Sequence, residues 1–237
     1  MRAFLVDAKG SVFLFIGKGY NGLSAESGRV LFGQAVKDKL DLRKPAKGRK
    51  RKMITKEDIQ NQIIQAVETV KRTNPMAGSI TNSVTINLVA NAQLAVGGSA
   101  AMVYLPDEGE FLAKAGGATY INVGTLLPIY EQTLPRTAKV LRETGKPWVL
   151  DPVAVGIGSL RTELLRQLKV YKPSVIRGNA SEVIALAGLW GFDGGSEESG
   201  VRGVDSTDSV TSAKAAAVAL ARWTGGAVAV SGKTDLI

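Results

Sequence analysis

The sequence of 237 residues is 45% hydrophobic, which is ordinary for a chain that can bury a globular core. It contains no cysteine and no histidine, so disulfide frameworks, the usual zinc sites and Ser-His or Cys-His nucleophile pairs are excluded. No uninterrupted apolar run reaches the roughly 18–20 residues that a membrane-spanning helix needs. The N-terminus, where Asp7, Lys9 and Gly10 interrupt the apolar stretch, is a poor signal peptide. We therefore expect a cytoplasmic protein without a membrane partner, in which any general base is a carboxylate, a lysine or a tyrosine.

The net charge of +9 is confined to the first part of the chain. Residues 1–52 contain 13 lysines and arginines against 4 acidic residues, whereas residues 53–237 contain 17 of each. Residues 43–52 (RKPAKGRKRK) form a basic run that we interpret as a solvated linker or surface, with a nucleic-acid or membrane contact as the alternative. The rest of the chain is electrically balanced, so no nucleic-acid partner is expected. This pattern predicts a basic N-terminal extension over residues 1–52 and one domain over residues 53–237.

Elements on both sides of the basic run can be predicted from local signals. Before it, residues 12–16 are typical of a strand and residues 30–40 of a weak helix. After it, Thr55 can cap a helix with Asp58 three residues on, and apolar residues follow at helical spacing. The Asn74-Pro75 pair should end this helix.

Beyond residue 75, short apolar strands alternate with helical stretches. The predicted strands cover residues 101–104, 120–123, 148–150, 174–176 and 227–230. The predicted helices cover residues 83–96, 108–115, 129–143, 160–170, 181–187 and 210–223, and Pro135 should break the third. Continuous apolar strands that alternate with helices predict an α/β fold, in which a largely parallel sheet is covered on both faces.

Polar side chains follow the predicted strands, at the edge where an open α/β sheet binds its ligands. Asp151 follows one strand, and Arg177 follows the next, with Glu182 five residues further on. Two carboxylates suit a hydrated magnesium ion that also binds phosphate oxygens, and an arginine suits phosphate recognition. Several glycines in the same turns would let the backbone approach a phosphate closely. The combination predicts phosphoryl transfer.

Each of these signals has a purely structural alternative. Asp151-Pro152 could be only a turn, Arg177 could form a surface ion pair, and Asn179 could cap a helix with Glu182 completing the box. The glycine pattern at residues 17–22 matches a dinucleotide fingerprint but lacks a following βαβ unit. Residues 231–234 (SGKT) resemble the end of a P-loop, but the required first glycine is replaced by Ala227.

Several motifs, taken in order, resemble the hydroxyethylthiazole kinase family over roughly residues 53–237. They are residues 79–82 (SITN), residues 84–94 (VTINLVANAQL), Met102 after a Gly-Gly pair, residues 121–126 (INVGTL), residues 151–153 (DPV) and residues 176–182 (IRGNASE). The resemblance implies a ribokinase-like three-layer α/β sandwich. It also implies phosphorylation of the hydroxyl of 4-methyl-5-(2-hydroxyethyl)thiazole, from ATP with Mg²⁺, in thiamine biosynthesis or salvage. Members of that family form homotrimers with active sites between subunits.

The resemblance also assigns site residues. It places Met102 and Asn82 at the thiazole, Arg177 and Ser231 at ATP, and Asp151 and Glu182 on the magnesium side. Ser231 stands where the family usually has a threonine, and Ala154 stands where it usually has a glycine.

The family's C-terminal glycine motif, which ends in cysteine and carries the catalytic group, has no counterpart in this sequence. Conversely, residues 1–52 of this sequence have no counterpart in the family. From this comparison we expect a sandwich that is incomplete at its C-terminus, and we assign no catalytic residue. Two alternatives stay open: another ribokinase-like small-molecule kinase, and a truncated chain that only binds its ligand.

Overall fold

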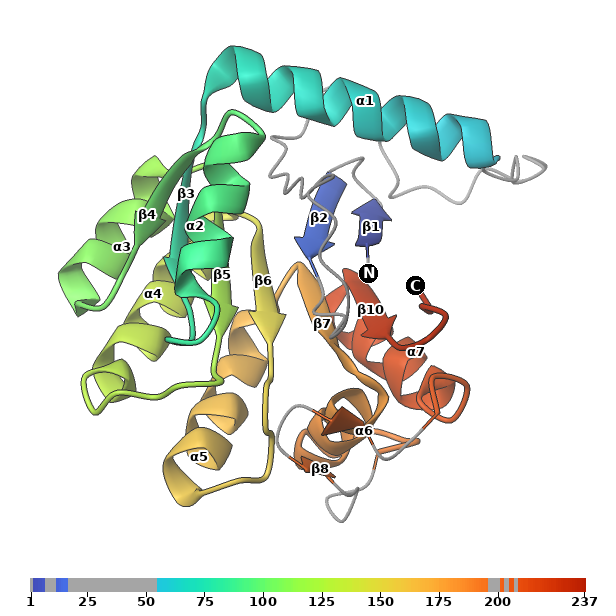
Figure 1. Cartoon of the computed structure of the whole chain (residues 1–237). Helices are drawn as coiled ribbons and strands as arrows, with labels where there is room; N and C mark the ends of the chain where they lie inside the picture. The colour runs from blue at the N-terminus through green and yellow to red at the C-terminus, as the bar shows by residue number, and fades with distance from the viewer. Residues whose placement is uncertain (1, 7–11, 17–54, 196–200, 203–204, 207–208) are drawn as a thin grey trace.

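The computed structural model describes residues 2–6, 12–16, 55–195, 201–202, 205–206 and 209–237 (Figure 1). The strands are β1 (Arg2–Val6), β2 (Val12–Ile16), β3 (Met76–Ile80), β4 (Ser99–Met102), β5 (Ala118–Asn122), β6 (Trp148–Asp151), β7 (Val175–Asn179), β8 (Val201–Arg202), β9 (Asp205–Ser206) and β10 (Ala227–Ser231). The helices are α1 (Lys56–Thr73), α2 (Ile86–Ala95), α3 (Pro106–Ala115), α4 (Tyr130–Thr144), α5 (Ser159–Leu168), the 3-10 helix η1 (Lys169–Tyr171), α6 (Ala180–Leu189) and α7 (Lys214–Thr224).

The ends of α1 confirm the local prediction for the start of the domain. Thr55 accepts a hydrogen bond from the backbone of Asp58 at 3.1 Å, and Asp58 accepts one from the backbone of Thr55 at 2.9 Å. Asn74 ends the helix in a left-handed conformation and donates to the carbonyl of Val70. The strand predicted over residues 12–16 is β2. The weak helix at residues 30–40, the basic run and the glycine pattern at residues 17–22 lie outside the described residues.

Six strands form one parallel sheet in the order β10-β7-β6-β5-β3-β4. Two other pairs, β1 with β2 and β8 with β9, are antiparallel. Among the described residues, no helix is long and apolar enough to cross a bilayer. The observed sheet confirms the predicted α/β fold with its parallel sheet.

Two local expectations were wrong. Strand β3 was not predicted, because its sequence MAGSI contains only one residue with a strong β preference, Ile80. It forms because it is enclosed between β4 and β5. Pro135 does not break α4, which continues from Tyr130 to Thr144. Leu134, Ala138 and Leu141 are fully buried in the core on both sides of the proline, and this packing outweighs the lost backbone hydrogen bond.

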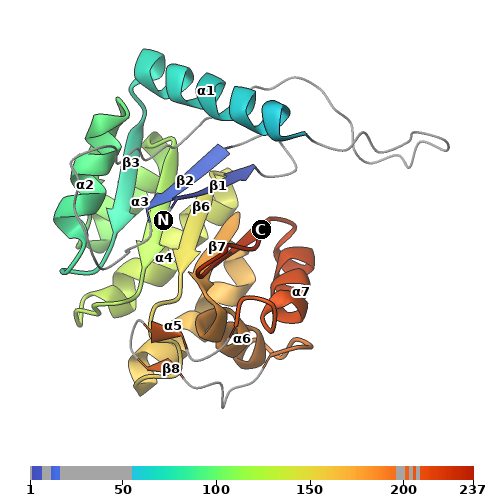
Figure 2. The same ribbon diagram turned by 45° about the vertical axis from the view of Figure 1, so that its right-hand side comes forward.

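The sheet has two differently covered faces. One face carries the large core, which α3, α4, α5, α6 and α7 complete. The other face is covered by α1 and α2. Val70 of α1, Ala92 of α2 and Val96 just after α2 pack on β3 and β5. We call this second side the α1/α2 face. On the same side, the β1–β2 hairpin lies beside β10 and α1 (Figures 1 and 2).

Candidate active site

Strand register places two of the predicted site residues, Asp151 and Arg177, in a row with Asn122 across the sheet. Asn122 is paired with Asp151 between β5 and β6, and Leu150 is paired with Ile176, one residue before Arg177, between β6 and β7. Side chains alternate along a strand, so these three polar side chains lie on the α1/α2 face while their apolar neighbours Leu150 and Ile176 enter the large core. The pleat and the register together bring residues from three strands to one place.

Asp151 is the centre of this row, and its two carboxylate oxygens have different surroundings. The residue is only 2% exposed. Its Oδ2 accepts hydrogen bonds from the Tyr120 hydroxyl at 2.8 Å, from Asn122 Nδ2 at 2.9 Å and from Arg177 at 3.3 Å. Its Oδ1 is buried without a hydrogen-bond partner. One oxygen is therefore saturated, and the other has no hydrogen-bond partner among the described residues.

Arg177 is an interior arginine, so the surface ion-pair alternative is not what the structure contains. Its side chain is 20% exposed, and one of its terminal nitrogens contacts Asp151. Burial alone would lower the pKa of Arg177, but the negative field of Asp151, with Tyr120 and Glu182, raises it above its ordinary value. The contact uses a single guanidinium nitrogen. Within the described part of the chain, the other donors of the fork make no hydrogen bond.

Glu182 lies at the start of α6, and its capping role is real. Its Oε2 accepts a hydrogen bond from the backbone of Asn179 at 2.8 Å, while its own N–H donates to Asn179 Oδ1 at 2.9 Å. The residue is 3% exposed. Burial, reinforced by the charge of Asp151, raises the pKa of Glu182 to about 7. The capping alternative is thus confirmed, and the cap itself holds the carboxylate close enough to Asp151 for their charges to interact.

The loop that follows Asp151 contains three left-handed residues. Ala154, Gly156 and Gly158 have φ of 59°, 86° and 80°. The backbone of Ala154 lowers the pKa of Glu182, against the larger effect of burial, so this loop lies beside the carboxylate. Glycine adopts this conformation without strain, whereas alanine does not. The alanine that replaces the expected family glycine therefore stands at a position with a conformational cost.

Asn82 joins the network from the far side of β5. Its Nδ2 donates to Asn122 Oδ1 at 3.0 Å, and its own Oδ1 accepts from the backbone of Val84 and Thr85 just before α2. Asn122 Oδ1 also accepts from the backbone of Gly124 at 2.9 Å. Asn122 thus bridges the residue expected at the thiazole to the carboxylate expected at the magnesium ion.

Ser231 lies at the end of β10, in register with Asn179 of β7. Its hydroxyl donates to the carbonyl of Gly178 at 3.2 Å. The P-loop alternative for residues 231–234 fails here, because a bend and an isolated bridge at Leu236 follow instead of a helix. Ser231 is therefore placed one strand beyond Arg177, at the same edge of the sheet.

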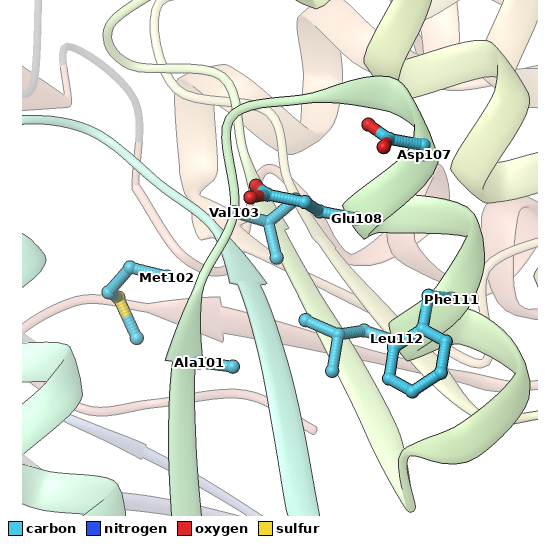
Figure 3. A pocket seen from close by; sticks show the side chains of 7 residues that line it. All are labelled: Ala101, Met102, Val103, Asp107, Glu108, Phe111 and Leu112. Carbon is cyan, nitrogen blue, oxygen red and sulfur yellow. The ribbon is translucent and has the colours of Figure 1, made fainter.

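Met102 is the predicted residue that the structure keeps apart. It lies on the edge strand β4, and three strand spacings, about 14 Å in total, separate it from Asp151 on β6. A cavity of about 500 Å³ is formed by β4 and α3, lined by Ala101, Met102, Val103, Asp107, Glu108, Phe111 and Leu112. The Met102 side chain extends to the opposite side of β4 from Leu112 (Figure 3). Met102 and Asp151 therefore do not meet within one chain.

The residues present fit a magnesium ion held jointly with phosphate. Among the described residues, no group of three or more acidic, histidine or cysteine side chains could enclose a metal ion alone. Magnesium, however, keeps several waters and binds through one or two carboxylates plus phosphates. The free Oδ1 of Asp151, with Glu182 nearby, supplies such a partial site.

Sequence reasoning missed three residues of this region. Tyr120 and Asn122 belong to a predicted strand. They are two residues apart, so their side chains share one face of the sheet, and Asp151 ends the next strand; this pattern could have predicted their contact with Asp151. Arg161 in α5 gave no such signal. It donates to the carbonyls of Val123 at 3.1 Å, Ile157 at 2.6 Å and Gly124 at 3.4 Å, so it ties the loop after β5 to the loop after β6.

Comparison with known proteins shows that the chain is similar to one family of kinases over most of its length. Residues 67–237 match the hydroxyethylthiazole kinase family. The hydroxyethylthiazole kinase of Bifidobacterium longum subsp. infantis is 52% identical over 197 residues, which cover 76% of this chain and 63% of that protein. The enzyme of that name from Granulibacter bethesdensis is 45% identical over 179 residues, covering 76% of this chain and 62% of that protein. A solved hydroxyethylthiazole kinase from Pyrococcus horikoshii OT3 is 32% identical with a TM-score of 0.60, over 74% of this chain and 62% of that one.

The chain thus spans less than two thirds of the length of these relatives. The family match nevertheless covers most of the present sequence, including every predicted site residue. By this match, the chain belongs to the hydroxyethylthiazole kinase family.

Proposed function

We propose that this protein transfers the terminal phosphoryl group of ATP to the hydroxyl of 4-methyl-5-(2-hydroxyethyl)thiazole, as a transferase of thiamine biosynthesis or salvage. One observation carries the proposal: in a chain of this family, Asp151, Arg177 and Glu182 converge at the carboxyl ends of the parallel strands. Phosphoryl transfer depends mainly on positioning and on compensation of negative charge. Arg177, which is partly buried, supplies positive charge for the phosphates, and the two carboxylates supply ligands for a cation that would compensate more of the negative charge.

In this proposal the nucleotide lies along the β6, β7 and β10 end of the sheet. The free donors of Arg177 would bind phosphate oxygens, and Ser231 on the neighbouring strand would add a hydroxyl. Asp151 Oδ1 and Glu182 would hold Mg²⁺, directly or through its waters. When bound, the ion would neutralise phosphate charge that two carboxylates alone would repel.

The thiazole is proposed to contact Asn82 and Met102. Asn82 is joined to the ion side through Asn122, whereas Met102 lies three strands away. In a homotrimer, Met102 of one subunit could contact the thiazole in an active site whose carboxylates belong to a neighbouring subunit. Such an arrangement would account for the separation of Met102 from Asp151 within one chain. Analytical ultracentrifugation tests the assembly, and a monomeric protein that still binds thiazole with full dependence on Met102 would argue against it.

Three further expectations stay proposals. We propose that residues 53–237 form the kinase-like domain and residues 1–52 an extension of it, and that the protein works in the cytoplasm. No catalytic group is assigned among the described residues. Ligand binding without turnover is kept as the second candidate function.

The nucleotide assignment is tested by calorimetry with Arg177→Ala. The variant should lose charge-assisted hydrogen bonds worth about 1.5–3 kcal/mol of ATP binding. Arg136→Ala is the matched control, because Arg136 forms an ion pair with Glu110 that is partly exposed. Unchanged ATP affinity in Arg177→Ala would count against the proposed nucleotide site.

The reaction is tested by ADP formation in the presence of the thiazole alcohol. Pyridoxal and a hydroxymethylpyrimidine serve as competing substrates, since other ribokinase-like kinases are the alternative. ADP formation that depends on the thiazole supports the kinase. ATP binding without thiazole-dependent turnover supports the ligand-binding function instead.

A further inference from the structure

Tyr120 is a partly buried residue of the site that neither the family motifs nor the strand-end residues include. Its hydroxyl donates to Asp151 Oδ2 at 2.8 Å and accepts from Asn122 Nδ2 at 3.0 Å. Its ring packs between two apolar clusters of the α1/α2 face, one that includes Ala118 and one that includes Val149. Both ends of the side chain are therefore held, the ring by packing and the hydroxyl by two hydrogen bonds.

The contact decides which oxygen of Asp151 is free. A carboxylate has about four lone-pair sites, two on each oxygen. Tyr120, Asn122 and Arg177 all donate to Oδ2, whereas Oδ1 is buried with no hydrogen bond. With three donors on one oxygen, rotation of the carboxylate would break all three contacts at once. The orientation of Asp151 is thus set by its neighbours before any ligand binds.

We propose that Tyr120 is a positioning residue that, with Asn122, locks Asp151 so that Oδ1 is presented to the bound divalent cation. This inference rests on the proposed function only in taking Asp151 as a magnesium-side carboxylate. It adds a residue from the middle of β5 that acts through Asp151 and not on the substrate.

The lock also keeps Arg177 available to the nucleotide. Arg177 reaches Asp151 through a single contact of 3.3 Å, which is longer than the bonds from Tyr120 and Asn122. Without the phenol hydroxyl, the carboxylate can turn and form the bidentate pair that arginine prefers. Such a pair would occupy Asp151 Oδ1, which we propose binds the cation, and the guanidinium donors of Arg177 that we propose bind phosphate.

The test is binding of Mn²⁺ to protein saturated with a non-hydrolysable ATP analogue, without thiazole, because the partial site needs phosphate oxygens to complete it. Binding is measured from the electron paramagnetic resonance signal of the protein-bound ion. Tyr120→Phe keeps the ring and removes only the hydroxyl, and it should weaken Mn²⁺ binding about tenfold, as losses of supporting hydrogen bonds to metal ligands do. Tyr171→Phe is the matched control, because Tyr171 lies in η1 before β7, at the opposite end of the sheet. The same two substitutions are repeated in an Asp151→Asn background.

A loss that occurs with Asp151 present and vanishes in the Asp151→Asn background supports the proposal, since it shows that the hydroxyl acts through the carboxylate. Equal Mn²⁺ affinity of Tyr120→Phe and the wild type overturns it. An equal loss in both backgrounds also overturns it, because the hydroxyl then supports only the fold. If the wild type binds Mn²⁺ no better than Asp151→Asn, the proposed magnesium site fails, and the positioning role falls with it.

Discussion

Gly178 and Glu182 are in such close contact that a Cβ at residue 178 would lie 3.2 Å from both Cβ and Oε2 of Glu182. The glycine therefore leaves the space in which the Glu182 carboxylate folds back onto the N-terminus of α6. Gly178→Ala should displace that carboxylate, destabilise the fold by about 1–3 kcal/mol and weaken Mn²⁺ binding. Urea unfolding and Mn²⁺ titration measure the two effects.

Gly78→Ala is the control for this substitution, because a Cβ there meets Leu112 at the same 3.2 Å but on β3, away from the carboxylates. It should lose comparable stability and keep its Mn²⁺ affinity. Full Mn²⁺ affinity in Gly178→Ala would contradict the role of Glu182 at the cation.

Stability should depend on pH through Glu182. Its pKa is raised from an ordinary 4.5 to about 7, so the folded chain binds a proton more tightly than the unfolded chain. The contribution is therefore fully present below about pH 4.5 and is lost as the pH rises through about 7, on the order of 1–3 kcal/mol. In chelator, Glu182→Gln should flatten the pH dependence of the unfolding free energy over this window. If the unfolding free energy of Glu182→Gln depends on pH as steeply as that of the wild type, the raised pKa of Glu182 is not the cause of the pH dependence.

Ala154 should be replaceable by glycine with a gain in stability. Its φ of 59° costs alanine roughly 1–2 kcal/mol, and the extra chain entropy of glycine offsets about 0.5–1 kcal/mol of this gain. Ala154→Gly should therefore stabilise the protein by up to about 1 kcal/mol in urea unfolding. Ala221→Gly, within helix α7, should instead cost about 1 kcal/mol. A loss at both positions would show that the left-handed conformation of Ala154 carries no strain.

Arg161 should resist replacement even by lysine. Its fork donates to three carbonyls in two loops, whereas the lysine ammonium is a point donor that cannot span them. We expect Arg161→Lys to lose about 1–3 kcal/mol of stability and to speed amide exchange in residues 123–127 and 154–158. Arg136→Lys, at a partly exposed ion pair, should change stability by less than about 1 kcal/mol. Unaltered exchange in Arg161→Lys would disprove the link between the loops.

Part of this structure could be predicted from interactions between residues that are close in the sequence. The capping boxes at Thr55 and Asn179 each need only residues three positions apart, so the pattern suffices to predict them. The alternation of strands and helices also predicts that Asp151, Arg177 and Glu182 gather at one edge, since parallel strands end there. Asp151 ends β6, whereas β7 continues to Asn179, so Arg177 lies within that strand and not after it as predicted.

The arrangement within that edge depends on contacts between distant residues. Tyr120 and Asp151 are 31 residues apart, and Asn82 and Asn122 are 40 apart. Their hydrogen bonds exist only because the sheet order and register place β5 between β6 and β3, and no local propensity encodes that register. The same holds for β3, which forms by enclosure between its neighbours, and for Met102, which the strand order carries away from Asp151. The sequence alone indicated the charged groups of the site, whereas the packed sheet decided which oxygen of Asp151 stays without a hydrogen bond, because that choice depends on donors from β5 and β7, the two strands that flank β6.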